Sequence, residues 1–246
     1  MKIAQRYITV ILFLFISFSF TMDAQSNKSI IYNAFVSGNM QKWKNTMDNM
    51  AQDKQLSNEQ QLELIGYYYG YIGYNLGVKN EKNAQVYIDK GEDIINKLFN
   101  NNFLIADVYA YKGAFVGFKI AISPYKAPFI GKSSIDNVKK AIAIDPNNIQ
   151  ANIERANVLY YSPSAFGGNK TEAKLFYTKA INLFEKDTAL KAQNWLYLSL
   201  LTNVATIYTE EKNYKEAKHI YDKILKIEPN YQYVKEKLLP DLLKKM

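Results

Sequence analysis

Residues 201–229, LTNVATIYTEEKNYKEAKHIYDKILKIEP, decide the fold of this chain. Apolar and small residues recur three and four positions apart in each half of the stretch, at Leu201, Val204, Ala205 and Tyr208 and then at Ala217, Tyr221 and Ile224. Positions three and four apart share one face of a helix, so each half predicts an amphipathic helix. The small residue in each half lets the helices approach closely. Residues 210–213 form the predicted turn, and Pro229 ends the second helix.

This spacing of large, small and aromatic residues, followed by a proline, resembles the tetratricopeptide repeat. Its second half recurs upstream around Val138 and Tyr177, and a weaker copy begins at Ala84. The resemblance implies an all-α fold, a right-handed superhelical stack of helix hairpins with a C-terminal capping helix. We expect one α-solenoid over residues 25–246. Its hairpins are expected at about 28–50, 58–100, 102–145, 148–186 and 190–228, and the capping helix at 230–245.

The first 24 residues have the composition of a signal peptide. Lys2 and Arg6 precede an apolar run at 8–20 that is too short to span a bilayer comfortably, and a cleavage site fits between Ala24 and Gln25. We therefore expect an exported protein, periplasmic or secreted, with no membrane span after cleavage. An uncleaved membrane anchor is the alternative.

Composition removes several classes of function. The chain has no cysteine, which excludes disulfides, thiol catalysis and cysteine metal clusters. The formal net charge is +8, but only one arginine, Arg155, follows the signal peptide, and arginine is the favoured side chain for phosphate and guanine contacts. Nucleic acid is therefore not an expected partner.

Catalytic motifs are also missing from the sequence. The single histidine, His219, falls on the charged face of the repeat's second helix, where we expect it to be solvated. We find no nucleophile elbow and no paired-histidine motif, and we predict a protein that is not an enzyme, with no catalytic residues, cofactor or metal ligands. A hydrolase or lyase whose carboxylates meet only in the folded protein remains the alternative.

Two inserted loops resemble each other, SPYKAPFIGKS at 123–133 and SPSAFGGNKT at 162–171. Each lies between the two helices of its hairpin, so we expect both at one edge of the stack, where they form a paired lip. The candidate binding residues in these loops are Tyr125, Phe129, Pro163, Phe166, Gly167 and Gly168. The structural alternative is that the prolines end helices, the glycines supply positive φ, and the phenylalanines fill the edge of the core.

The second loop is also similar to a loop in the periplasmic tetratricopeptide subunits of tripartite ATP-independent (TRAP) transporters. The similarity rests on Pro163, Gly167 and Gly168 and does not extend to the first half of the chain. It implies a cell-envelope protein that helps a solute-binding partner or holds a small apolar ligand.

A helix expected from Asn58 to about Val78 carries glycines at 66, 70, 73 and 77 beside Tyr67, Tyr71 and Tyr74. A glycine inside a helix costs about 0.5 to 1 kcal/mol relative to alanine, so the stripe indicates that something large approaches the backbone. The three tyrosines are candidate binding residues for an aromatic or apolar ligand. Core packing is the alternative for them.

Together these patterns predict a stacked helical-hairpin module that binds a protein or peptide partner on its concave face, as a scaffold in the cell envelope. The second hypothesis is a ligand-holding or transport-associated protein, with a small apolar ligand held by Tyr67, Tyr71, Phe129 and Phe166.

Overall fold

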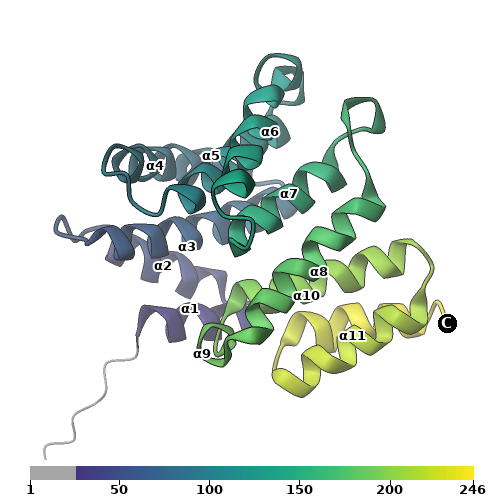
Figure 1. The fold of residues 1–246 in the computed structure, drawn as a ribbon. Helices are drawn as coiled ribbons and strands as arrows, with labels where there is room; N and C mark the ends of the chain where they lie inside the picture. Colours follow the sequence, from purple (N-terminus) through teal and green to yellow (C-terminus); the bar gives the residue numbers. More distant parts are fainter. Residues whose placement is uncertain (1–25) are drawn as a thin grey trace, which may run out of the picture.

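A computed structural model describes residues 26–246, and the predicted signal peptide lies outside this range. All regular elements within it are helical, which confirms the predicted all-α fold (Figure 1). The α-helices are α1 (Asn27–Val36), α2 (Met40–Met50), α3 (Asn58–Gly77), α4 (Glu81–Asn100), α5 (Ile105–Ile122), α6 (Ala127–Ile144), α7 (Ile149–Tyr161), α8 (Lys170–Lys186), α9 (Thr188–Lys191), α10 (Trp195–Glu210), α11 (Tyr214–Ile227) and α12 (Leu239–Leu243). Two short 3-10 helices, η1 (Pro124–Lys126) and η2 (Ser164–Phe166), and a π-helical segment, η3 (Tyr233–Leu238), complete the set.

Successive helices pair as hairpins, α1 with α2, α3 with α4, α5 with α6, α7 with α8 and α10 with α11. Several helices begin at an asparagine or serine whose side chain accepts an N–H of the first turn. Asn39 caps α2, Ser57 caps α3 and Asn148 caps α7 in this way. These polar residues satisfy backbone donors that have no partner within the helix. The sequence therefore sets the hairpins locally, through caps and apolar stripes.

The C-terminal segment, predicted as one capping helix, consists of η3 followed by α12. Pro240 lies in the first turn of α12, where its missing N–H is not required by the helix. Tyr231, Val234 and Leu242 are buried against the last hairpin.

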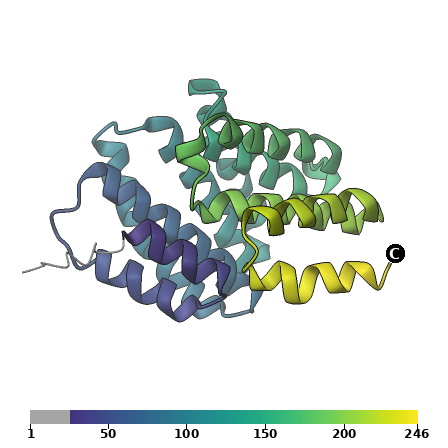
Figure 2. The same ribbon diagram turned by 90° about the horizontal axis from the view of Figure 1, so that it is seen from below.

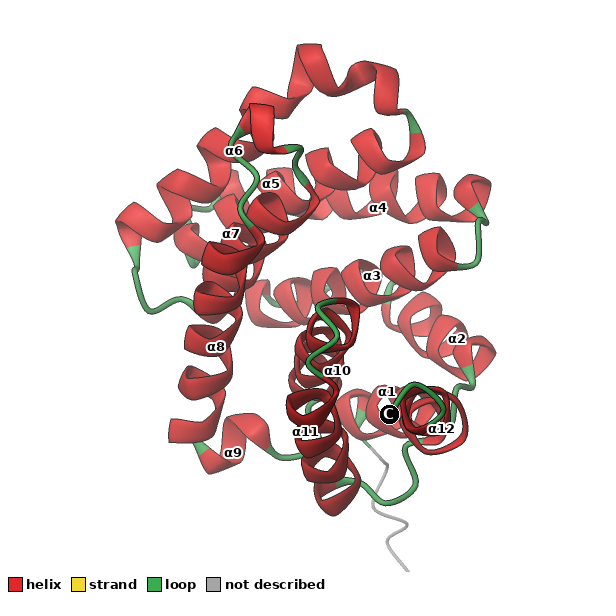
Figure 3. Cartoon of the chain, turned by 90° about the vertical axis from the view of Figure 1, so that its right-hand side faces the viewer, coloured by secondary structure: helices red, strands yellow, loops and turns green. Residues whose placement is uncertain are grey.

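The first hairpin lies against the last one, so the row of hairpins closes on itself (Figures 2 and 3). The Tyr32 hydroxyl on α1 donates to Glu228 Oε2 at 2.9 Å. The Trp43 and Trp195 rings, on α2 and α10, meet edge to face with centroids 4.9 Å apart. Phe35 and Trp195 contact both of the two large hydrophobic clusters of the core and join them. The repeat pattern predicts a stack, and the closure is an additional finding of the tertiary structure.

Close helix packing explains part of the glycine stripe on α3, and it explains Gly113 on α5 in the same way. A Cβ added at Gly70 would lie 2.6 Å from the Trp195 ring and 2.8 Å from the Trp43 ring. One added at Gly113 would lie 2.6 Å from Val138. At Gly73, by contrast, an added Cβ would meet nothing within 4 Å. Packing therefore accounts for some glycines of the stripe and leaves the carboxyl end of α3 open.

Across residues 26–246 we find no helix that combines the length and the apolar character needed to cross a bilayer.

Candidate binding surface

Exposed aromatic side chains gather at two hairpin tips. Within residues 26–246, the large hydrophobic side chains with the greatest exposure are Phe129 (83%), Tyr125 and Tyr161 (74% each) and Phe166 (71%). The first two belong to the α5–α6 tip and the last two to the α7–α8 tip, and we call these four residues the aromatic rim. Both tips lie at the top of the molecule in Figures 1 and 3. A cluster of uncovered aromatic rings indicates a binding surface more often than a scattered exposed residue does.

The two tips are built alike because their sequences are alike. In each, a Ser-Pro pair follows the first helix, a 3-10 turn comes next, and the second helix then begins. Proline cannot continue a helix in its interior, so α5 and α7 end at the residue before the serine. The aromatic side chains are thus carried by the turn or by the helix ends beside it, which keeps them outside the core.

The structural alternative for the loops, in which the glycines supply positive φ and the phenylalanines fill the edge of the core, is right for Gly167 alone among the glycines and wrong for the phenylalanines. Gly167 has φ of 86°, and a Cβ on Gly168 would lie 1.8 Å from the Ser162 carbonyl oxygen, so both positions require glycine. Phe129 and Phe166 are exposed and fill no part of the core, and Pro163 is exposed as well.

Lysines accompany the aromatic rim. Lys126, Lys132 and Lys170 fall within 123–133 and 161–171, and these two stretches contain no Asp or Glu. The Lys126 Nζ lies 6.0 Å from the centroid of the Tyr125 ring. Lys132 pairs with Asp136 on the solvent side of α6, and the Lys170 Nζ is 3.7 Å from Glu210. Exposed pairs of this kind hold the lysines weakly, so the rim presents positive charge to a partner.

The three candidate tyrosines of α3 lie apart from the rim. Tyr67 and Tyr71 are buried in the amino-terminal core, as the packing alternative predicted, whereas Tyr74 is 42% exposed. Burial and a hydrogen bond to Glu63 raise the pKa of the Tyr67 hydroxyl. The structure therefore does not bring Tyr67 and Tyr71 together with Phe129 and Phe166 around one ligand.

A buried polar network, which the sequence did not reveal, joins α3, α7 and α8. The Glu154 carboxylate accepts hydrogen bonds from Gln150 Nε2 at 2.7 Å and from Asn157 Nδ2 at 3.1 Å, and it also contacts the Tyr69 hydroxyl. The Tyr177 hydroxyl donates to Asn157 Oδ1 at 2.6 Å. Burial outweighs these bonds and raises the pKa of the Glu154 carboxyl to about 7.

Features of a catalytic or metal site are sparse. His219 is exposed on α11, and across residues 26–246 no three His, Asp or Glu side chains are placed to hold a metal ion together. The aromatic rim offers apolar contacts through its rings and electrostatic contacts through the lysines beside them.

The last hairpin, α10 with α11, matches a known protein family. Residues 198–231 match the tetratricopeptide repeat family. The chain contains a tetratricopeptide repeat. In this repeat Ala205 and Ala217 are fully buried between α10 and α11, and Leu201, Tyr221 and Ile224 complete the apolar face, as the spacing predicted.

The fold is similar to that of the HusA haemophore from Porphyromonas gingivalis, with a TM-score of 0.59. The alignment covers 76% of this chain and 96% of that chain at 15% sequence identity, so the likeness concerns the fold alone. A comparison of the sequence with curated proteins found no match. Binding scaffolds are commonly built from tetratricopeptide repeats such as the one at 198–231.

Proposed function

We propose that this protein is an exported scaffold of the cell envelope that binds a protein or peptide partner through the aromatic rim. The observation that carries the proposal is the placement of the four strongly exposed aromatic side chains at the tips of two consecutive hairpins. The tetratricopeptide repeat at 198–231 supports a binding role. The closed arrangement of the hairpins supports the tips as the contact surface, because α1 and α2 cover part of the remaining repeat surface.

The size of the aromatic rim suits an interaction surface. An aromatic side chain buries about 150–250 Å² when it is covered, so four rings contribute roughly 600 Å². A stable interface covers about 800 Å² on each partner, and its binding energy is concentrated in a few aromatic and arginine side chains. The rim thus supplies most of the area that one side of an interface needs.

A quadruple variant with serine at Tyr125, Phe129, Tyr161 and Phe166 is expected to lose its partner and keep its fold. Removal of aromatic anchors typically costs 2 kcal/mol or more of binding free energy each, whereas exposed positions change stability by about 0.5 kcal/mol or less. Crosslinking of the tagged protein in its native envelope, followed by mass spectrometry, is expected to recover one dominant partner with the wild type and none with the variant.

The matched control for this experiment replaces two exposed hydrophobic residues away from the tips, Tyr233→Ser and Leu243→Ser. It should retain the partner. Equal recovery by the quadruple variant and this control would show that the rim is not the contact surface.

The proposal that the protein is exported depends on the signal-peptide composition of residues 1–24. We expect the protein isolated from its native cells to begin at Gln25 and to fractionate with the envelope, as measured by N-terminal mass spectrometry. A full-length protein that begins at Met1 and stays in the cytoplasmic fraction would contradict it.

A second candidate function is the carriage of a small apolar ligand. It is favoured by the fold likeness to a haemophore and by the exposed rings of the rim, which could hold a flat molecule. The resemblance of the second loop to TRAP-associated subunits agrees with it and stays a prediction. Native mass spectrometry and a haem titration followed by absorbance test this function, and an unchanged haem spectrum together with an absence of copurified ligand would count against it.

A further inference from the structure

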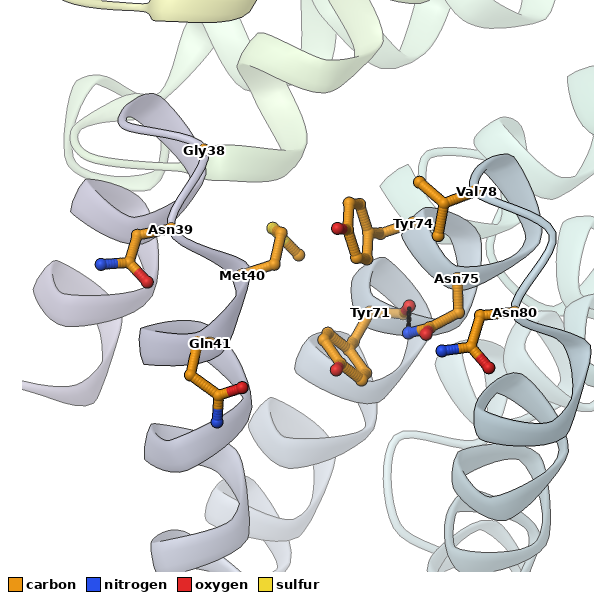
Figure 4. A pocket seen from close by; sticks show the side chains of 9 residues that line it. All are labelled: Gly38, Asn39, Met40, Gln41, Tyr71, Tyr74, Asn75, Val78 and Asn80. Carbon is orange, nitrogen blue, oxygen red and sulfur yellow. Dashed lines mark hydrogen bonds between the residues drawn. The ribbon is translucent and has the colours of Figure 1, made fainter.

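A pocket between the amino terminus of α2 and the carboxyl terminus of α3 has an uncharged, amide-rich lining (Figure 4). Its volume is about 430 Å³. Its lining includes four carboxamide side chains, Asn39, Gln41, Asn75 and Asn80, and two tyrosines, Tyr71 and Tyr74. No charged residue lines the pocket, which restricts the ligands that it can bind.

Two tyrosines form the aromatic side of this pocket. The Tyr71 and Tyr74 rings lie 6.0 Å apart, centroid to centroid, and are tilted by 32°. Figure 4 shows the Tyr74 ring facing Met40 across the opening. Tyr74 is 42% exposed, so part of its ring is available to a ligand.

Asparagine side chains hold Tyr71 in place. Asn83 Nδ2 donates to the Tyr71 hydroxyl at 3.2 Å and to Asn75 Oδ1 at 2.9 Å, and Asn75 Nδ2 donates to the Tyr71 carbonyl at 2.7 Å. The Tyr71 hydroxyl accepts this hydrogen bond and donates none among residues 26–246, so its hydrogen is available to a ligand in the pocket that Tyr71 lines.

The amides at the pocket's edges keep hydrogen-bonding capacity of both kinds. Asn80 Oδ1 accepts from the Asn83 N–H to cap α4, which leaves the Asn80 NH₂ group as a donor. Gln41 Nε2 donates to Asn45 Oδ1 at 2.8 Å, which leaves the Gln41 carbonyl oxygen as an acceptor. The Asn39 side chain points away from the tyrosines in Figure 4 and adds little.

The open glycines of α3 lie beside this pocket. Gly73 precedes Tyr74, and Gly77 lies one helical turn after it, on a neighbouring position of the same helix surface. A Cβ at either glycine would meet nothing within 4 Å, so packing does not explain why these positions lack a side chain. Their effect is to leave the α3 surface around these positions free of side chains, next to the pocket.

We propose that this pocket binds a neutral polyhydroxylated ligand, a saccharide of one or two units. Sugar hydroxyls both donate and accept, which matches the tyrosine hydroxyl and the carboxamides, and the C–H face of a sugar ring stacks on an aromatic ring. An ionic ligand would lose hydration without gaining a counter-charge. A purely apolar ligand would leave the amides and the hydroxyl unpaired, at a cost of about 1–3 kcal/mol for each buried group. The volume lies within the range of about 300–1,000 Å³ typical of small-molecule sites.

Chemical-shift titration of the isotope-labelled full chain tests this inference. The probes are maltose, cellobiose and N,N′-diacetylchitobiose, with digalacturonic acid as the charged comparison. At least one neutral disaccharide is expected to shift the backbone resonances of Tyr74, Asn75 and Val78 in a saturable manner, and digalacturonic acid is expected to bind at least about tenfold more weakly. If no neutral probe shifts these resonances, or if the acidic one binds as well, the inference fails.

Two variants separate the pocket from the rest of the surface. Tyr74→Ala and Gln41→Leu change exposed side chains, and each is expected to weaken disaccharide binding by about tenfold or more with an unchanged fold. Tyr233→Ala, at an exposed tyrosine outside the pocket, is the control and should bind as the wild type does. Wild-type affinity in both pocket variants would refute the assignment. The outcome is independent of the partner bound by the aromatic rim.

Discussion

Replacement of Trp195 with alanine is expected to lower the free energy of unfolding by about 3 kcal/mol and to loosen the first hairpin from the last. The Trp195 ring lies against Trp43, with centroids 4.9 Å apart, and against Phe35 at 5.9 Å. It also fills the space over Gly70, where a Cβ has no room. Its loss therefore leaves a cavity between the two hydrophobic clusters that it joins.

The measurements are urea denaturation for stability and hydrogen exchange for local opening. The matched control is Phe184→Ala, which removes a buried ring that packs against Tyr197 in one of the two clusters and does not belong to the other. Both variants should be destabilised, but only Trp195→Ala should speed exchange in α1 and α2 as well as in α10. If the two variants give the same exchange pattern, Trp195 does not join the two ends of the stack.

The Glu154→Gln variant is expected to be more stable than the wild type at pH 8, by up to about 3 kcal/mol, and to lose this advantage near pH 4.5. Burial raises the pKa of the Glu154 carboxyl from 4.5 to about 7, and no basic side chain is among the partners that offset it. Between pH 4.5 and 7, therefore, Glu154 keeps its proton in the folded protein and has lost it in the unfolded chain. The contribution of Glu154 to the free energy of unfolding is at its maximum below pH 4.5 and decreases as the pH rises to 7.

The ionisable side chains that interact with Glu154 do not change charge in the pH range of this experiment. Tyr69 from α3, Tyr111 from α5, Tyr161 from α7 and Tyr177 from α8 all interact with its charge and have raised pKa values, so they remain neutral through this range. Burial also raises the pKa of the Asp107 carboxyl on α5. Protonation of Asp107 therefore also makes the protein more stable as the pH falls, but in a lower pH range than Glu154.

Urea denaturation of wild type and variant at half-unit steps from pH 4.5 to 8 measures the effect. Glu172→Gln is the control, because Glu172 is an accessible carboxylate that pairs with Arg155. We expect the stability difference between Glu154→Gln and wild type to grow with pH, and that between Glu172→Gln and wild type to show no such growth. A pH-independent difference for Glu154→Gln would contradict the raised pKa.

The candidate surface could be predicted in part. The likeness of the two Ser-Pro loops pointed to Tyr125, Phe129 and Phe166, because prolines and glycines act on the backbone locally and leave a visible signature. Tyr161 was missed, although its place directly before Ser162-Pro163 was a usable signal. Glu154 had no such signal, since its burial depends on α3 and α8 covering one side of α7.

The sequence by itself determined the helices, their pairing into hairpins and the repeat at 198–231, because helix faces, caps and turns depend on residues only a few positions apart. Only the tertiary structure decided that the first hairpin meets the last, that Trp43 packs on Trp195, and that Tyr71 and Tyr74 border a pocket with α2. Each of these contacts depends on the small rotation from one hairpin to the next. That rotation accumulates along the stack from many side-chain contacts and appears in no short stretch of the chain.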